Sequence, residues 1–90
     1  MPLYTFFLEY RGGTYVSQVR ARSSPLAIKA WAGKFIELNV PGLGIRSKSD
    51  LVEKILRDAP TALDGLKNTW CSSALVRGQL ALIHFTQTEG

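Results

Sequence analysis

Two pairs of alternating apolar and polar segments, each pair joined through a glycine, most constrain what this chain can fold into. The first pair consists of Leu3–Arg11 and Thr14–Arg22, which flank Gly12-Gly13. The second pair consists of Thr69–Val76 and Gln79–Thr88, which flank Arg77-Gly78. Such alternation is typical of half-buried strands, and glycine supplies the positive φ that a two-residue turn requires. The sequence therefore predicts two β-hairpins.

The positions of the turns determine which side chains share a face. With Gly12-Gly13 at the first turn, Tyr10 opposes Tyr15 and Phe6 opposes Val19. One face of this hairpin is then apolar and is expected to face the core; it holds Tyr4, Phe6, Leu8, Tyr10, Tyr15, Val19 and Ala21. The other face is mixed and holds Thr5, Phe7, Glu9, Arg11, Thr14, Val16, Gln18 and Arg20. In the second hairpin, Trp70 opposes Phe85 and Cys71 opposes His84.

Two helices are predicted between the hairpins. Ser24 is a suitable N-cap, and Pro25 then occupies the first helical position. The apolar stripe of this first helix consists of Ile28, Trp31, Phe35 and Leu38, at helical spacing. The proline and glycines of Val40–Gly44 end it. A second helix is predicted for Asp50–Ala59 with Asp50 as its cap, and residues 60–68 form a connector.

These elements predict one α+β domain over residues 1–90, with the order β-β-α-α-β-β. We expect a two-layer structure in which both hairpins form one antiparallel sheet and both helices pack on one of its faces. The pattern also allows the hairpins to form two separate sheets. The expected core consists of Tyr4, Phe6, Leu8, Tyr10, Val19, Ile28, Trp31, Phe35, Ile55, Trp70, Ile83 and Phe85.

The formal net charge of +4 is concentrated in the first half of the chain. The basic residues there are Arg11, Arg20, Arg22, Lys29, Lys34, Arg46 and Lys48, and the acidic ones are Glu9 and Glu37. A basic half attracts nucleic acid, an acidic protein or an anionic ligand, whereas a modest net charge also serves solubility alone.

Cys71 and His84 are the one pair with catalytic character, because a nearby base is what activates a thiol. No third residue that would orient the histidine is evident from the sequence. A single cysteine and a single histidine are too few for a Cys/His zinc site within one subunit. We therefore expect no enzyme activity, no metal and no cofactor.

Two kinds of binding function are left. The outer face of the first hairpin offers Phe7, Arg11, Gln18 and Arg20, with Arg22 and Lys29 nearby, and aromatic and basic side chains together bind single-stranded nucleic acid. The same face, with the second hairpin, offers an apolar patch of Phe7, Val16, Leu75, Leu80 and Leu82. The leading hypothesis is a protein-interaction module that binds another protein or a second copy of itself, and the alternative is a nucleic-acid-binding domain.

The run GGTYV, a strand and then SSPLAIKAW is similar in layout to the start of the HicB-type antitoxin domain, which opens with a hairpin and a helix. The likeness covers about the first third of the chain, and that family inserts a further strand before the helix. No residue role follows from it. The lone cysteine and the absence of a long apolar run favour a cytoplasmic protein with no membrane segment.

Overall fold

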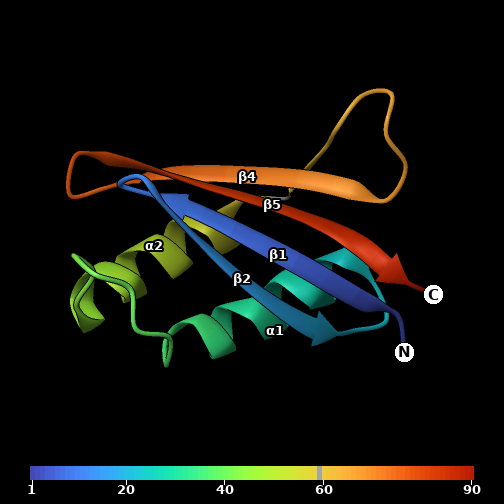
Figure 1. The fold of residues 1–90 in the computed structure, drawn as a ribbon, viewed down its shortest axis with the longest axis horizontal. Coiled ribbons are helices and arrows are strands. Elements are labelled where there is room, and N and C mark those ends of the chain that lie inside the picture. The colour runs from blue at the N-terminus through green and yellow to red at the C-terminus, as the bar shows by residue number, and fades with distance from the viewer. Residues whose placement is uncertain (59) are drawn as a thin grey trace.

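The alternating segments form the four long strands β1 (Leu3–Tyr10), β2 (Gly13–Arg20), β4 (Thr69–Val76) and β5 (Gln79–Glu89). The structure, a computed structural model, describes residues 1–58 and 60–90. Both hairpins belong to one antiparallel sheet of the order β2-β1-β5-β4-β3, so the expectation of a shared sheet is confirmed (Figure 1). The fold is α+β, with two helices and five strands in the described residues, where the sequence predicted four strands.

The additional strand is β3 (Thr61–Ala62), which lies in the predicted connector. It pairs with β4, where Thr61 is opposite Cys71 and Ala62 is opposite Trp70. A strand of two residues is too short to show alternation in the sequence. It forms through pairing with β4, so it could not be predicted from the pattern.

The first turn differs from the prediction by one residue on each strand. Arg11 and Gly12 occupy the turn with φ of 50° and 80°, and Tyr10 is opposite Gly13. The predicted Gly12-Gly13 turn is wrong because Gly13 is needed as a strand residue: a Cβ there would lie 2.7 Å from the hydroxyl oxygen of Tyr15. The resulting register shift of two residues keeps every side chain on its predicted face.

The second hairpin has the predicted register. Trp70 is opposite Phe85 and Cys71 is opposite His84. Its turn consists of Arg77 and Gly78, with φ of 53° and 74°. Both hairpins therefore turn through an Arg-Gly pair with positive φ at both positions, which matches the twist of the flanking strands.

The first helix, α1 (Ser24–Phe35), begins one residue earlier than predicted. Ser23 is its N-cap, with its hydroxyl oxygen accepting the N–H of Leu26 at 3.4 Å. Ile28, Trp31 and Phe35 are buried as a stripe, while Leu38 follows the helix and is half-buried.

The second helix, α2 (Ile45–Arg57), begins five residues before the predicted start. Gly44 is its N-cap, and Asp50 lies within the helix, 3.0 Å from the amine of Lys54. The earlier start follows from burial, because it places Lys48, Leu51 and Ile55 on one inward face. Ala59, the predicted last residue, lies outside the described residues.

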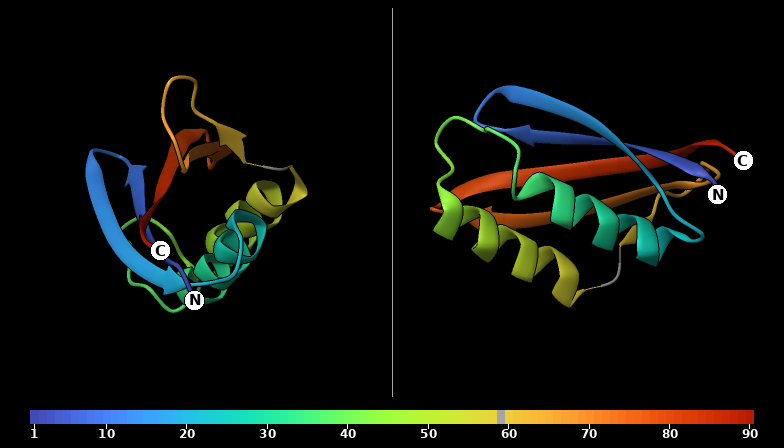
Figure 2. Two further views of the ribbon diagram at one scale, coloured as in Figure 1. Left: turned by 90° about the vertical axis from the view of Figure 1, so that its right-hand side faces the viewer. Right: turned by 90° about the horizontal axis from the view of Figure 1, so that it is seen from below.

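Both helices pack on the same face of the sheet, and the sheet curves around them (Figure 2). The layer between the sheet and the two helices is built from stacked aromatic rings. Their centroids are 4.4 Å apart for Phe6 and Phe85 and 4.8 Å apart for Trp31 and Phe35. All residues of the expected core are buried except Trp70, which is half-buried against it. Each large buried side chain contributes about 1.5–3 kcal/mol through removal of apolar surface from water.

Candidate functional site

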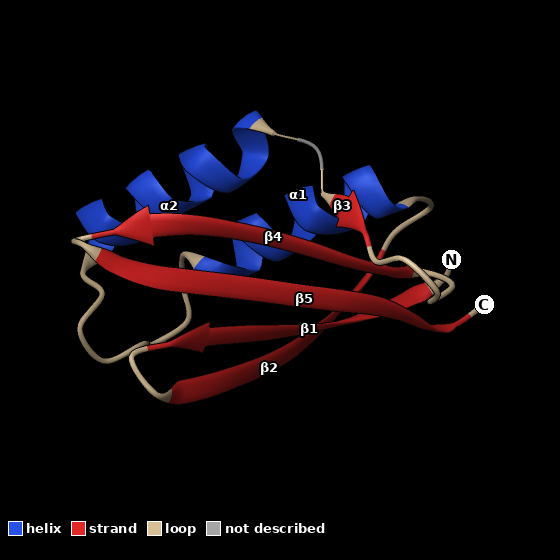
Figure 3. Ribbon diagram, turned by 90° about the horizontal axis from the view of Figure 1, so that it is seen from above, coloured by secondary structure: helices blue, strands red, loops and turns tan. Residues whose placement is uncertain are grey.

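The face of the sheet opposite the helices is not covered by any element of residues 1–58 and 60–90 (Figure 3). We call it the outer face. Because side chains alternate along a strand, it receives the residues that β1, β2, β4 and β5 do not send to the core. It is therefore the open face of the sheet in the described residues.

The half of the outer face near the two turns is apolar. Its members are Phe7, Val16, Leu75, Leu80 and Leu82, which we call the apolar patch. Phe7 is paired with Val16 on β1 and β2, and Leu75 is paired with Leu80 on β4 and β5; between these two pairs, Phe7 is opposite His84 and Leu82 is opposite Glu9. Val16, Leu75 and Leu80 are 56%, 60% and 57% exposed. A hollow of about 320 Å³ beside Leu80 and Leu82 extends to the first turn.

One ion pair lies within this patch. His84 is opposite Phe7 across β5 and β1, and its Nε2 lies 3.4 Å from a carboxylate oxygen of Glu9. Glu9 in turn is opposite Leu82. An acid and a base thus lie side by side among apolar side chains, and the sequence pattern had not identified Glu9 as the partner of His84.

Cys71 lies opposite His84 as predicted, but no hydrogen bond joins the two side chains in the described part of the chain. The Sγ atom of Cys71 instead lies 4.0 Å from the carbonyl oxygen of Ser72. It borders a hollow of about 340 Å³ between Asp58 and Ser73, in which His84 takes no part. A reactive role for Cys71 and His84 stays a prediction.

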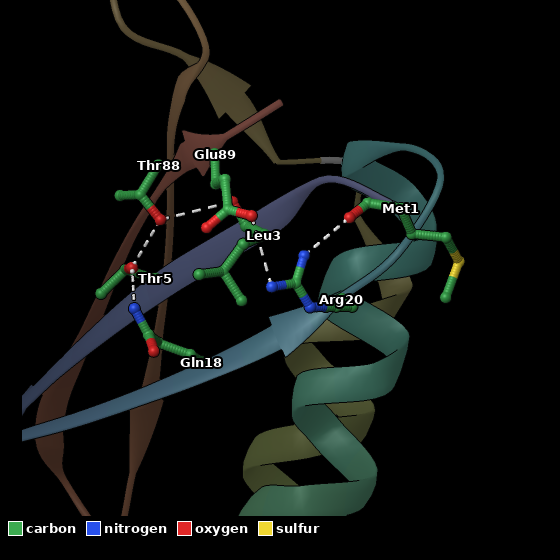
Figure 4. A network of polar contacts seen from close by, with 7 residues as sticks. All are labelled: Met1, Leu3, Thr5, Gln18, Arg20, Thr88 and Glu89. Atoms are coloured by element: carbon green, nitrogen blue, oxygen red, sulfur yellow. Dashed lines mark hydrogen bonds and ion pairs between the residues drawn. The ribbon is translucent and has the colours of Figure 1, made fainter.

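The half of the outer face near the termini is polar, and its groups bond to one another (Figure 4). The Thr5 and Thr88 hydroxyl oxygens are 2.9 Å apart, and the Gln18 amide donates to Thr5 at 3.0 Å. Arg20 donates to the Met1 carbonyl at 2.9 Å and lies 3.4 Å from the Glu89 carboxylate. These contacts hold the two chain ends against the sheet. The side chains of the apolar patch take part in none of them.

A lysine from a helix binds each side of the sheet: the edge strand β2, and the part of β4 that lies beyond its pairing with β3. Lys34 of α1 donates to the Gln18 carbonyl on β2 at 2.7 Å, and Lys54 of α2 donates to the Leu75 carbonyl on β4 at 2.6 Å. Lysines at edges are a common device against the addition of another strand. Sequence reasoning missed both, because the contacts join segments that are distant along the chain.

The six side chains proposed from the sequence as a binding surface do not converge. Phe7 and Gln18 lie on the outer face, in its apolar and polar halves respectively. Arg11 is in the first turn and Arg20 is beside Glu89 at the other end of the strand pair. Arg22 precedes α1 and Lys29 is an exposed residue of that helix. Their role in binding stays a prediction.

The part of the chain that the structure describes contains no group of three or more His, Cys, Asp or Glu side chains able to hold a metal ion. Neither described helix has the length and apolar composition needed to span a bilayer. No protein-family model matches the chain, and neither a curated protein nor a solved structure matches it.

Proposed function

We propose that this chain is a protein-interaction module that binds its partner through the apolar patch, and that a second copy of the chain is such a partner. The observation that carries the proposal is the exposure of Val16, Leu75 and Leu80 on one face of the sheet that no described element covers. Exposed apolar patches of this kind, rimmed by polar groups, are typical of interaction sites.

The polar groups in the patch support self-association. A carboxylate oxygen of Glu9 lies 3.4 Å from Nε2 of His84. In a two-fold dimer each surface meets its own copy, so we infer that a contact between this carboxylate and the imidazole also forms between the two chains. Packing of two sheets face to face is the geometry that uses such a surface. The edge lysines Lys34 and Lys54 favour this mode over strand addition.

The test compares two leucines of equal exposure. Leu75 in the patch and Leu66 in the loop after β3 are both 60% exposed. We expect Leu75→Glu to shift sedimentation equilibrium toward monomer by at least about tenfold in dissociation constant, because a charge would be desolvated in the interface. Leu66→Glu adds the same charge outside the patch and leaves the dissociation constant unchanged. A wild-type protein that is monomeric at every concentration would refute self-association.

The location in the cytoplasm and the absence of catalysis stay predictions from the sequence. A role in nucleic-acid binding is not proposed, because the geometry disperses the basic side chains that it needs.

A further inference from the structure

A second site, independent of the proposed interaction surface, lies between the first turn and the loop that precedes α2. The space there has a volume of about 450 Å³ and is lined by residues 10–13, Tyr15, Pro41 and Gly42. This volume is in the range of small-molecule pockets. Because the two lining segments are about thirty residues apart, only the tertiary fold creates the pocket.

The pocket contains one cation with no counter-charge. The guanidinium of Arg11 reaches across to the loop, where its Nη1 lies 2.7 Å from the position that a Cβ on Gly42 would occupy. Gly42 has φ of +88°, so both the backbone and the close guanidinium favour glycine there. Within residues 1–58 and 60–90, Arg11 forms no ion pair, and no Asp or Glu lines the pocket.

Two tyrosines, Tyr10 and Tyr15, also line the pocket. Tyr10 is 2% exposed, and its hydroxyl is closed to solvent and has no hydrogen-bond partner in the described residues. Because water cannot reach that hydroxyl, a ligand in the pocket cannot reach it either, and Tyr15 is the tyrosine that is available for a hydrogen bond. The hydroxyl of Tyr15 lies over Gly13, which also lines the pocket.

We propose that this pocket binds a small ligand through an oxyanion, either a carboxylate or a phosphate. Arg11 supplies the positive charge, and the hydroxyl of Tyr15 donates a hydrogen bond. Guanidinium groups pair with both kinds of oxyanion through charge-assisted hydrogen bonds, which are stronger than neutral ones. Gly12 leaves open space beside its backbone, while the Arg11 guanidinium lies over Gly42 and the Tyr15 hydroxyl lies over Gly13.

The experiment titrates the full-length protein, labelled with nitrogen-15, with inorganic phosphate and separately with benzoate, at constant ionic strength. The amide signals of Gly12, Gly13 and Gly42 report on the pocket. We expect saturable shifts at these glycines with at least one probe. Preference for phosphate identifies a phosphate ligand, and preference for benzoate identifies a carboxylate on an apolar frame.

A matched pair of variants separates a specific site from general attraction by positive charge. Arg11→Gln and Arg77→Gln remove the same charge from the same position of equivalent turns, but Arg77 does not line the pocket. We expect Arg11→Gln to weaken binding by about tenfold or more, and Tyr15→Phe by roughly fivefold, as for loss of a charged and a neutral hydrogen bond. Arg77→Gln should retain the wild-type affinity.

Three outcomes overturn the proposal. The pocket is not a site if neither probe gives saturable shifts at the glycines. The attraction is non-specific if Arg77→Gln weakens binding as much as Arg11→Gln does. The pocket does not bind its ligand in the proposed way if Tyr15→Phe binds like the wild type. Self-association through Leu75 is measured separately, so either proposal can fail while the other stands.

Discussion

Lys48 is the residue whose role changes most between sequence and structure. It belongs to the basic first half of the chain, yet it is 8% exposed and its amine is enclosed. The amine donates to the carbonyl oxygens of Ile36, at 3.3 Å, and Leu38. These carbonyls follow the end of α1, where partial negative charge favours a cation. Lys48 therefore joins the start of α2 to the end of α1.

Replacing Lys48 with methionine tests this structural role. Lys48→Met keeps most of the side-chain volume but leaves the two carbonyls without their donor. We expect the free energy of unfolding, measured by urea denaturation, to fall by about 1–3 kcal/mol. Lys67→Met removes the same charge from an exposed loop position and should change stability by less than about 0.5 kcal/mol. Equal effects of the two substitutions would show that the carbonyl contacts do not stabilise the fold.

At the scale of the elements, the two helices cover the sheet face and also restrict its edges. Lys34 extends from α1 to the Gln18 carbonyl of β2, and Lys54 extends from α2 to the Leu75 carbonyl of β4. Beside Lys54, the short strand β3 pairs with Trp70 and Cys71 of the same β4 edge. An unprotected edge offers free N–H and C=O groups to another chain, so these contacts oppose the addition of a further strand.

Removing both edge lysines should therefore open a second route of association. We expect the double variant Lys34→Met and Lys54→Met to form larger oligomers that bind thioflavin, at concentrations where the wild type does not. The control is Lys29→Met with Lys67→Met, which lowers the net charge equally and leaves both edges in place. If both double variants formed oligomers of equal size, the association would be due to the lost charge and not to the opened edges. Circular dichroism checks that the fold is retained.

At the scale of the whole molecule, positive charge is spread over several surfaces. Arg11 and Arg77 lie in the two turns, Arg20 lies beside Glu89, and Lys34 and Lys48 are bound to carbonyls. Phosphate-binding surfaces depend on several basic groups acting along one backbone, and each contact adds to the salt dependence. This distribution favours weak and non-specific attraction to nucleic acid.

Fluorescence anisotropy of labelled single-stranded RNA across a salt series measures this directly. We expect weak binding at low salt that is lost near physiological ionic strength. Single substitutions of Arg11, Arg20 or Arg22 by glutamine should each lower affinity by a similar small factor. The nucleic-acid-binding hypothesis would instead be supported by tight binding at physiological ionic strength. It would also be supported if one of these substitutions alone abolished the binding.

Much of the fold can be predicted from this sequence because its patterns are local. Alternation places Phe6 and Phe7 on opposite faces, and helical spacing unites Ile28, Trp31 and Phe35. The choice between turns at Arg11-Gly12 and Gly12-Gly13 could not be predicted, because Tyr15 and Gly13 decide it through a contact in space. The start of α2 could not be predicted either, since the burial of Lys48 depends on the end of α1.

The candidate sites divide in the same way. The apolar patch was predictable, because alternation alone assigns Phe7, Val16 and Leu75 to one face of their strands. The Glu9–His84 pair and the pocket of Arg11 with Gly42 could not be predicted, because each joins segments far apart in the chain.

The sequence by itself determined the two hairpins, the helical stripe and the two faces, since periods of two and of about 3.6 residues follow from local backbone geometry. Only the tertiary structure decided the pairing of β1 with β5 and the contacts that depend on it, because long-range pairing reflects the packing of the whole chain.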